Sequence, residues 1–128
     1  MTQKIIPTLH ELQLGDNEFI VTKTDETGLI TYANPVFIAL SGYSEQELLG
    51  SQHNIVRHPD MPRAVFHLLW NTIKAGEEFH GYVKNLSKDG SFYWVIATIT
   101  PSFSPETGSI IGFYSVRRKP YRQKLAVI

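Results

Sequence analysis

The chain has 128 residues, with 12 basic and 12 acidic side chains, so its formal net charge at pH 7 is zero. This length suits one domain with a single hydrophobic core, and the balanced charge argues against nucleic acid as a main partner. The sequence has no cysteine, which excludes disulfides, thiolate catalysis and cysteine-ligated metal sites.

The first part of the chain predicts an N-terminal segment followed by a β-hairpin. Residues 1–17 lack a sustained hydrophobic period, but their leucines could cap the core or contact a second copy of the chain. Two β-prone runs follow at residues 19–22 and 29–32, and the polar residues between them end in Gly28. Because glycine is available for a positive φ, this pattern predicts a hairpin turn.

Two short helices are expected after the hairpin. Asn34-Pro35 is typical of the N-cap and first turn of a helix, which should run through residue 40. Ser44 and Glu47 match the capping-box pattern, in which the two side chains satisfy free backbone donors reciprocally. A second helix should therefore run to about residue 49.

The stretch of residues 53–70 combines apolar residues with a dense set of polar groups. Two prolines restrict its backbone, and apolar side chains at three- and four-residue spacing over residues 65–73 then predict a helix with an aromatic face. A rigid polar loop that leads into such a helix could line a pocket for a planar ligand with a polar edge. A structural explanation is also open, because Asp60 could cap the helix and pair with Arg57. The polar residues are His53, Asn54, Arg57, His58 and Asp60.

The remainder of the chain predicts three β-strands. Lys88-Asp89-Gly90 is a tight-turn signal between the first two strands, and residues 101–108 should form a longer loop before the last. Five strands with helices grouped between the second and third predict an α+β domain, in which short helices cover one face of an antiparallel sheet. The three alternating runs are residues 79–86, 91–100 and 110–118.

These elements resemble a PAS domain over about residues 18–119, preceded by the segment 1–17 and followed by a linker start at 120–128. The motifs that carry the resemblance are Asn34-Pro35-Val36-Phe37, Ser41-Gly42-Tyr43-Ser44 and Lys88-Asp89-Gly90 followed by Tyr93-Trp94-Val95. The narrower segment HNIVRHPDMP, with Trp70 and Val83-Lys84-Asn85 downstream, resembles the flavin-binding PAS domain of bacterial aerotaxis receptors. That resemblance implies non-covalently bound FAD and a redox signal passed to a chemotaxis signalling module.

The same resemblance implies which residues contact the cofactor. Trp70 falls where an aromatic residue lies beside the isoalloxazine ring, and stacking suits a planar ligand. Asn85 falls where flavin-binding PAS domains place an amide that both donates to and accepts from the ring edge. Arg57 could neutralise a cofactor phosphate or hold Asp60 in place. The polar cluster associated with flavin binding is His53, Asn54, Arg57, His58 and Asp60.

Comparison with the light-sensing flavin PAS domains, the LOV group, separates this chain from them at one point. Their reactive cysteine would align near residues 50–53, and this chain has no cysteine, so a photochemical thiol adduct is excluded. Arg117 stands about where the LOV group has a glutamine that faces the flavin. If Arg117 points inward, its charge would favour a reduced, anionic flavin. A solvent-facing Arg117 is the alternative, since strand residues alternate faces.

Two other functional classes stay open. Five histidines leave haem as an alternative ligand, and a cofactor-free PAS interaction module is the third class. FMN is left open as an alternative to FAD, because the length of the pocket decides between the two. The chain has no glycine-rich phosphate loop, serine elbow or diagnostic metal-ligand spacing, so we expect a sensor and not an enzyme.

The location and assembly of the chain follow from the same features. No apolar run approaches the roughly 20 residues that cross a bilayer, and the N-terminus does not read as a signal peptide. We therefore expect a cytoplasmic domain without direct membrane insertion, or the cytoplasmic part of a membrane-anchored receptor. Because PAS domains commonly pair through N-terminal segments and sheet faces, the resemblance also implies a homodimer.

Overall fold

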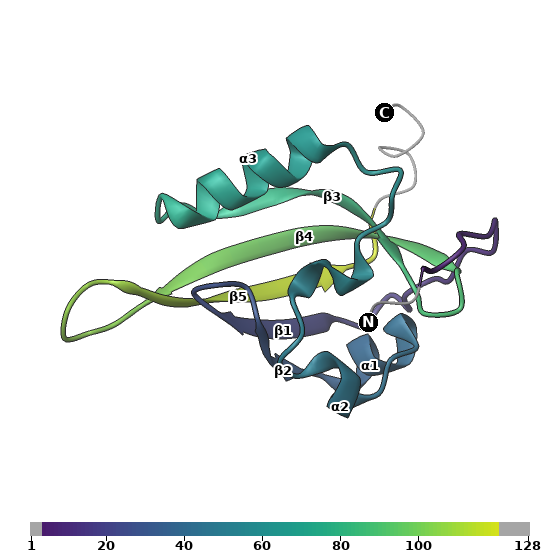
Figure 1. Ribbon diagram of the computed structural model, residues 1–128, viewed down its shortest axis with the longest axis horizontal. Helices are drawn as coiled ribbons and strands as arrows, with labels where there is room; N and C mark the ends of the chain where they lie inside the picture. The colour runs from purple at the N-terminus through teal and green to yellow at the C-terminus, as the bar shows by residue number, and fades with distance from the viewer. Residues whose placement is uncertain (1–3, 121–128) are drawn as a thin grey trace.

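The computed structural model describes residues 4–120 and folds them into a five-stranded antiparallel sheet with helices packed against it (Figure 1). The strand order is β2-β1-β5-β4-β3. The strands are β1 (Ile20–Asp25), β2 (Ile30–Ala33), β3 (Phe79–Leu86), β4 (Phe92–Phe103) and β5 (Ile110–Arg118). The helices are α1 (Pro35–Ser41), α2 (Glu45–Leu48), a 3₁₀ helix (His53–Val56) and α3 (Arg63–Lys74). This architecture confirms the α+β prediction.

One face of the sheet forms the core under the helices. Alternate residues of the central strands are buried while their neighbours are more exposed, which is the period-two pattern of a sheet covered on one side. Helix α1 packs on β1, and α3 packs on β3 and β4. The buried residues of β4 and β5 on this inner face are Tyr93, Val95, Ala97, Phe113, Ser115 and Arg117.

The N-terminal segment lies beside the start of β4. The backbone N–H of Leu12 donates to the carbonyl of Phe92 at 2.8 Å, and the N–H of Phe92 donates to the carbonyl of His10 at 3.0 Å. Leu14 is buried in the main core cluster. Part of the predicted segment 1–17 thus packs on the domain, and its contact with a second copy stays a prediction. The predicted linker start, residues 120–128, lies outside the described residues apart from Pro120.

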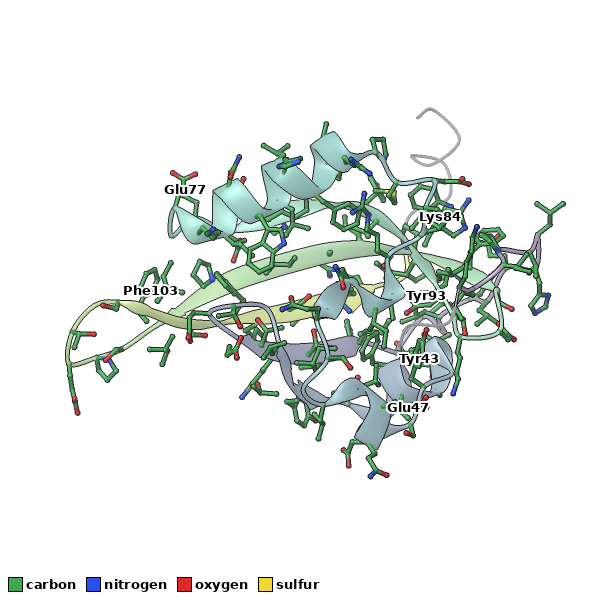
Figure 2. The ribbon with its side chains drawn as sticks, in the orientation of Figure 1. Tyr43, Glu47, Glu77, Lys84, Tyr93 and Phe103 are labelled. Atoms are coloured by element: carbon green, nitrogen blue, oxygen red, sulfur yellow. The ribbon has the colours of Figure 1, made fainter. Side chains whose placement is uncertain are left out.

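Strand β4 is longer than the sequence predicted. It continues to Phe103, where a loop was expected from Pro101, and Pro101 pairs with Phe113 of β5. Strand β3 begins at Phe79, opposite Ile99, so in the described part of the chain β4 beyond Ile99 is paired only with β5, and a proline there loses no ladder partner on the β3 side. Figure 2 shows Phe103 on the part of β4 that extends past the rest of the sheet.

The buried stripe of α3 also differs from the prediction. Leu68 was expected on the apolar stripe, but it is 61% exposed. The buried line of α3 is Leu69 and Ile73, which are one turn apart. Because adjacent helical residues are about 100° apart, Leu68 faces away once Leu69 faces the sheet. Between residues 4 and 120, no helix combines the length and apolar character needed to span a membrane.

The start of α1 is fixed by one side chain that also holds β1. Asn34 Oδ1 accepts from the backbone N–H of Phe37 at 3.2 Å, as the N-cap prediction requires. The same oxygen accepts from the N–H of Val21 at 3.1 Å, and Asn34 Nδ2 donates to the carbonyl of Phe19 at 2.8 Å. The predicted capping box of α2 is also present at Ser44.

We expect Asn34→Ala to lower the free energy of unfolding by about 2–3 kcal/mol, and Ser44→Ala by about 1 kcal/mol. Both variants remove a helix cap, but Asn34→Ala also leaves backbone groups of β1 without their partners. Urea unfolding of the two variants beside the parent protein measures the difference. Equal losses would show that the contacts of Asn34 to β1 add nothing.

Candidate functional site

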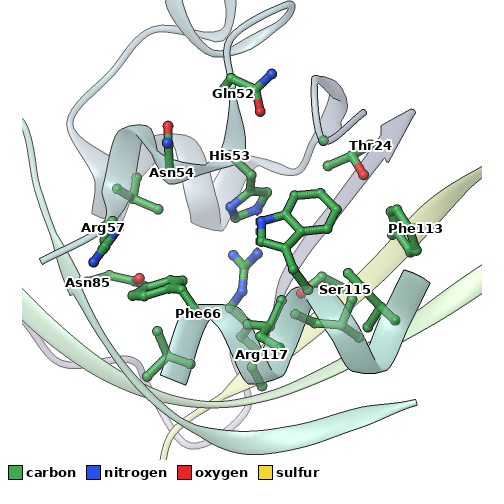
Figure 3. Close-up of a pocket in the computed structure, with 18 residues that line it drawn as sticks. Thr24, Gln52, His53, Asn54, Arg57, Phe66, Asn85, Phe113, Ser115 and Arg117 are labelled. Atoms are coloured by element: carbon green, nitrogen blue, oxygen red, sulfur yellow. Dashed lines mark hydrogen bonds between the residues drawn. The ribbon is translucent and has the colours of Figure 1, made fainter. Parts of the chain in front are cut away.

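A cavity lies between α3, the 3₁₀ helix and the inner face of β3, β4 and β5 (Figure 3). Its volume is about 120 Å³, several times the roughly 30 Å³ that one water takes in the liquid, so it has room for part of an organic ligand. Of the eight residues that the sequence predicted as cofactor contacts, six line it. They are His53, Asn54, Arg57, Trp70, Asn85 and Arg117.

Helix α3 supplies the apolar wall. Phe66, Leu69, Trp70 and Ile73 all line the cavity, and they share one face of α3 because each lies three or four residues from another of the set. The indole of Trp70 lies edge-on to Phe113, with ring centroids 5.7 Å apart. The wall therefore offers aromatic and aliphatic surface from one helix, as the sequence pattern predicted.

The turn between β1 and β2 closes against this wall. Gly28 has a φ of 93°, and a Cβ added there would lie 2.8 Å from the Trp70 ring. Only glycine therefore fits without displacing the indole. The carbonyl of Gly28 also accepts from the backbone N–H of His53 at 3.0 Å, so the turn is joined to the 3₁₀ helix.

The sheet supplies the polar wall, and its polar groups lack partners. Within residues 4–120, four buried side-chain atoms have no hydrogen-bond partner, and three of them belong to cavity residues: Asn85 Nδ2, Ser115 Oγ and Arg117 Nη1. Each of these residues is at most 5% exposed. A buried polar group left unpaired costs about 1–3 kcal/mol. Three such groups around one cavity indicate a ligand with a polar, acceptor-rich edge.

Arg117 points inward, which answers the question that its strand position left open. Its Nη2 donates to Thr22 Oγ1 at 3.2 Å and also contacts His53 Nε2. Within residues 4–120 no carboxylate lies within ion-pair distance of it. Burial lowers the pKa of Arg117 to about 10, so the guanidinium keeps its charge at neutral pH.

His53 is held neutral between the sheet and α1. Its ring stacks on Phe37 with centroids 5.8 Å apart and planes 19° apart. Burial, and then the positive charge of Arg117, hold the pKa of His53 well below its usual value. Since Arg117 has only donors, Nε2 must present its lone pair to the guanidinium.

Arg57 and Asn54 lie on the same side of the cavity as the 3₁₀ helix. The guanidinium of Arg57 lies over the Phe66 ring, 4.3 Å from its centroid. The backbone of Arg57 forms an isolated β-bridge with Asn85. Asn54 is exposed, and Arg57 is half-buried, so the two present polar groups near solvent and not in the closed end of the cavity.

His58 and Asp60 do not line the cavity. Asp60 is largely exposed and pairs with Lys84 Nζ at 3.1 Å, so the Arg57–Asp60 pair that the sequence allowed is replaced by a different partner. His58 is buried, lies edge-on to Phe92, and its Nδ1 accepts from the backbone N–H of Asp60 at 3.0 Å. The structure therefore does not place these two predicted residues in the cavity lining, and their contact with a cofactor stays a prediction.

The sequence analysis missed Ser115 and Thr22. Ser115 lies two residues before Arg117 on β5, and Thr22 pairs with Ser115 across β1 and β5. Strand alternation places residues 113, 115 and 117 on one face. If the sequence had shown that Arg117 faces inward, Ser115 could have been predicted as a cavity residue on the same face. The sequence did not determine which face of the sheet Arg117 occupies.

Comparisons with known proteins agree with this geometry. Residues 30–117 match the family model described as the PAS fold. The chain is 41% identical over 121 residues to the aerotaxis receptor of Escherichia coli (strain K12), covering 94% of this chain and 24% of the receptor. It is 31% identical over 98 residues to the nitrogen fixation regulatory protein of Klebsiella pneumoniae, covering 77% and 20%.

The fold also matches solved structures. A light-oxygen-voltage domain studied with a flavin analogue superposes with a TM-score of 0.76 at 22% identity, covering 84% of this chain and 82% of that one. At this identity the likeness concerns the fold. The chain spans about a quarter or less of the length of the two curated relatives above.

We expect Arg117→Met to raise the pKa of His53, because it removes the nearby positive charge that disfavours the imidazolium. The pKa should stay below the usual histidine value, since burial is the larger cause and remains. NMR titration of the imidazole resonances measures both effects. The matched control is Arg118→Met, on the exposed side of β5, which should leave the pKa of His53 unchanged. An unchanged pKa in Arg117→Met would contradict the electrostatic coupling.

Proposed function

This chain belongs to the PAS-fold family, and on that premise we propose that it is an FAD-binding sensor domain that detects redox state and relays it to a chemotaxis signalling module. The observation that carries the proposal is the cavity, which opposes aromatic surface to three buried polar groups without partners. The 41% identity to an aerotaxis receptor supports a chemotaxis signalling module as the target of the signal. A receptor and a regulatory protein among the relatives support sensing as the role.

The residues of the cavity fit a flavin ring. Trp70 and Phe66 would hold the flat apolar faces, since both offer aromatic surface. Asn85 and Ser115 would hold the polar edge, because an amide and a hydroxyl can each donate and accept. Arg117 would hold a part of that edge that accepts hydrogen bonds, since a guanidinium only donates.

Arg117 links this site to redox state. When bound, a flavin supplies reversible electron uptake, which makes its ring edge more negative. A buried guanidinium stabilises such charge strongly, because no carboxylate within residues 4–120 pairs with it and it is shielded from solvent. The charge on the ligand therefore alters the interactions of a residue on β5 at the centre of the sheet.

Flavin is favoured over haem by the state of the one histidine in the cavity lining. His53 Nε2 already contacts Arg117 and Thr22, so it is not free to bind iron. FAD is favoured over FMN by the resemblance of residues 53–62 to aerotaxis receptors. Arg57 and Asn54, near solvent at one side of the cavity, are the residues that would meet a cofactor phosphate.

The signalling module of this proposal is a partner outside the chain. The match covers 24% of the length of the aerotaxis receptor. The partners of the receptor's other parts therefore cannot be inferred from this chain. We place the domain in the cytoplasm in this proposal, where the receptor's signalling module would be accessible to it.

We expect purified protein to show a yellow flavin spectrum, and Asn85→Leu to weaken flavin binding by about five- to tenfold, the equivalent of one lost hydrogen bond of about 1 kcal/mol. The free energy of unfolding of the ligand-free variant should be unchanged or higher, because the substitution removes an unpaired buried amide nitrogen. Flavin titration and urea unfolding give the two quantities. Extraction and chromatography of the pigment distinguish FAD from FMN.

The matched control is Asn71→Leu, the same substitution at an exposed position of α3 outside the cavity. It should leave flavin binding unchanged. A colourless protein that does not bind added flavin would contradict the proposed cofactor, and a haem spectrum would replace it. Full flavin affinity in Asn85→Leu would show that Asn85 does not contact the ligand.

A further inference from the structure

Three side chains form a closed triangle on the inner face of the sheet. Arg117 Nη2 donates to Thr22 Oγ1 at 3.2 Å and contacts His53 Nε2, and Thr22 Oγ1 lies 3.0 Å from the same imidazole nitrogen. Figure 3 shows the guanidinium of Arg117 rising from β5 towards the His53 ring, inside the group of cavity residues. The second nitrogen of this guanidinium, Nη1, is buried and has no partner.

The triangle makes two events at His53 mutually exclusive. While Arg117 donates to Nε2, that nitrogen uses its lone pair as an acceptor and cannot also carry a proton. If Arg117 moves to another acceptor, Nε2 becomes free to bind a proton. It can then donate that proton to Thr22 Oγ1, which is already within hydrogen-bond distance.

We propose that Arg117 exchanges His53 for the cavity ligand when the ligand gains negative charge, and that His53 then takes up a proton. The proposal rests on the proposed function, because the negative charge is that of a reduced flavin. It adds a residue role to that function: His53 couples proton uptake to the redox state of the site without contacting the reacting atoms.

The exchange balances in charge and protons. An external reductant supplies electrons to the site, and the guanidinium of Arg117 turns its donors towards the added negative charge. Water supplies the proton that His53 Nε2 binds, and Thr22 Oγ1 accepts it in a hydrogen bond in place of the one from Arg117. No covalent bond of the protein forms or breaks except this N–H bond. Oxidation reverses each change.

The surroundings of His53 make Arg117 the group that controls it. Thr22 of β1 and Phe37 of α1 face the imidazole and carry no charge. Tyr93 of β4 interacts electrostatically with Arg117, but burial raises the pKa of Tyr93, so its hydroxyl stays neutral. The positive charge of Arg117 is the charge in the described chain that lowers the pKa of His53, after burial.

The test reads the protonation of histidine directly. Nitrogen-15-labelled protein is loaded with FAD, and dithionite then reduces the bound flavin. Visible absorption confirms binding before the reduction and the reduced state after it. Long-range proton–nitrogen NMR spectra, recorded across a pH titration of the oxidised and of the reduced protein, distinguish neutral from doubly protonated imidazole. We expect the proton affinity of His53 to be at least about tenfold higher in the reduced protein, so that its imidazole becomes doubly protonated at a higher pH than in the oxidised protein.

The other four histidines are internal controls. His58 is the most informative, since its pKa is also lowered by burial, but it lies outside the cavity. It should keep its protonation state on reduction. A change shared by all the histidines would overturn the proposal, because the triangle predicts a local event.

A pair of variants tests the geometry of the triangle. Thr22→Val removes the acceptor for protonated His53 and leaves every residue that lines the cavity unsubstituted, so it should lower the proton affinity of His53 in the reduced protein several-fold. Thr98→Val is the matched control, since Thr98 Oγ1 lies 3.0 Å from His80 Nδ1 on an exposed part of the sheet. It should leave His53 unchanged.

The outcomes separate this inference from the proposed function. Protein that binds no flavin by absorption overturns the proposed function. Bound flavin that reduces while the proton affinity of His53 stays the same overturns the exchange and leaves the proposed function standing. If Thr22→Val leaves the proton affinity of His53 in the reduced protein unchanged, the contact between Thr22 and His53 does not control the proton uptake.

Discussion

The buried guanidinium of Arg117 is the constraint around which the inner face of this domain is arranged. A charge taken out of water costs several kcal/mol unless it is paired, and within residues 4–120 this one has no carboxylate partner. Thr22 and His53 supply two neutral acceptors on one side. On the other side is the cavity, so the ligand-free domain keeps unsatisfied binding capacity at the point where a ligand would enter. Fold stability does not explain such a residue, but ligand binding does.

The two walls of the cavity would contribute differently to binding: α3 offers an apolar surface, and the sheet offers polar and charged groups. Trp70, closed in by Gly28 and Phe113, excludes water from the apolar side. A dry site strengthens every polar contact that a ligand makes on the sheet side. The small residue Ala97 pairs with Arg117 across β4 and β5. The apolar packing and the buried charge are thus placed on different elements, α3 and β5.

The local elements of the fold were predictable because their signals are local. The N-cap at Asn34, the capping box at Ser44 and the positive φ of Gly28 each depend on a few neighbouring residues. Leu68 and Pro101 were predicted wrongly because their environment is set at long range. Helical spacing cannot tell which side of α3 meets the sheet, and a proline is acceptable in β4 only because β3 does not extend alongside Pro101.

The predicted site shows the same division. Trp70, Asn85 and Arg57 could be named from the resemblance, and the structure brings them to one cavity. His58 and Asp60 are close to Arg57 in sequence but lie outside the cavity lining, because the chain passes around the edge strand β3. Arg57 bridges the backbone of Asn85, whose side chain faces the cavity, whereas Asp60 pairs with Lys84, the next residue back on β3 and therefore on the opposite face. We infer that His58 and Asp60 hold the segment that crosses β3 in place and so determine the position of Arg57. Their contribution to ligand binding would then be to position Arg57 and not to contact the ligand.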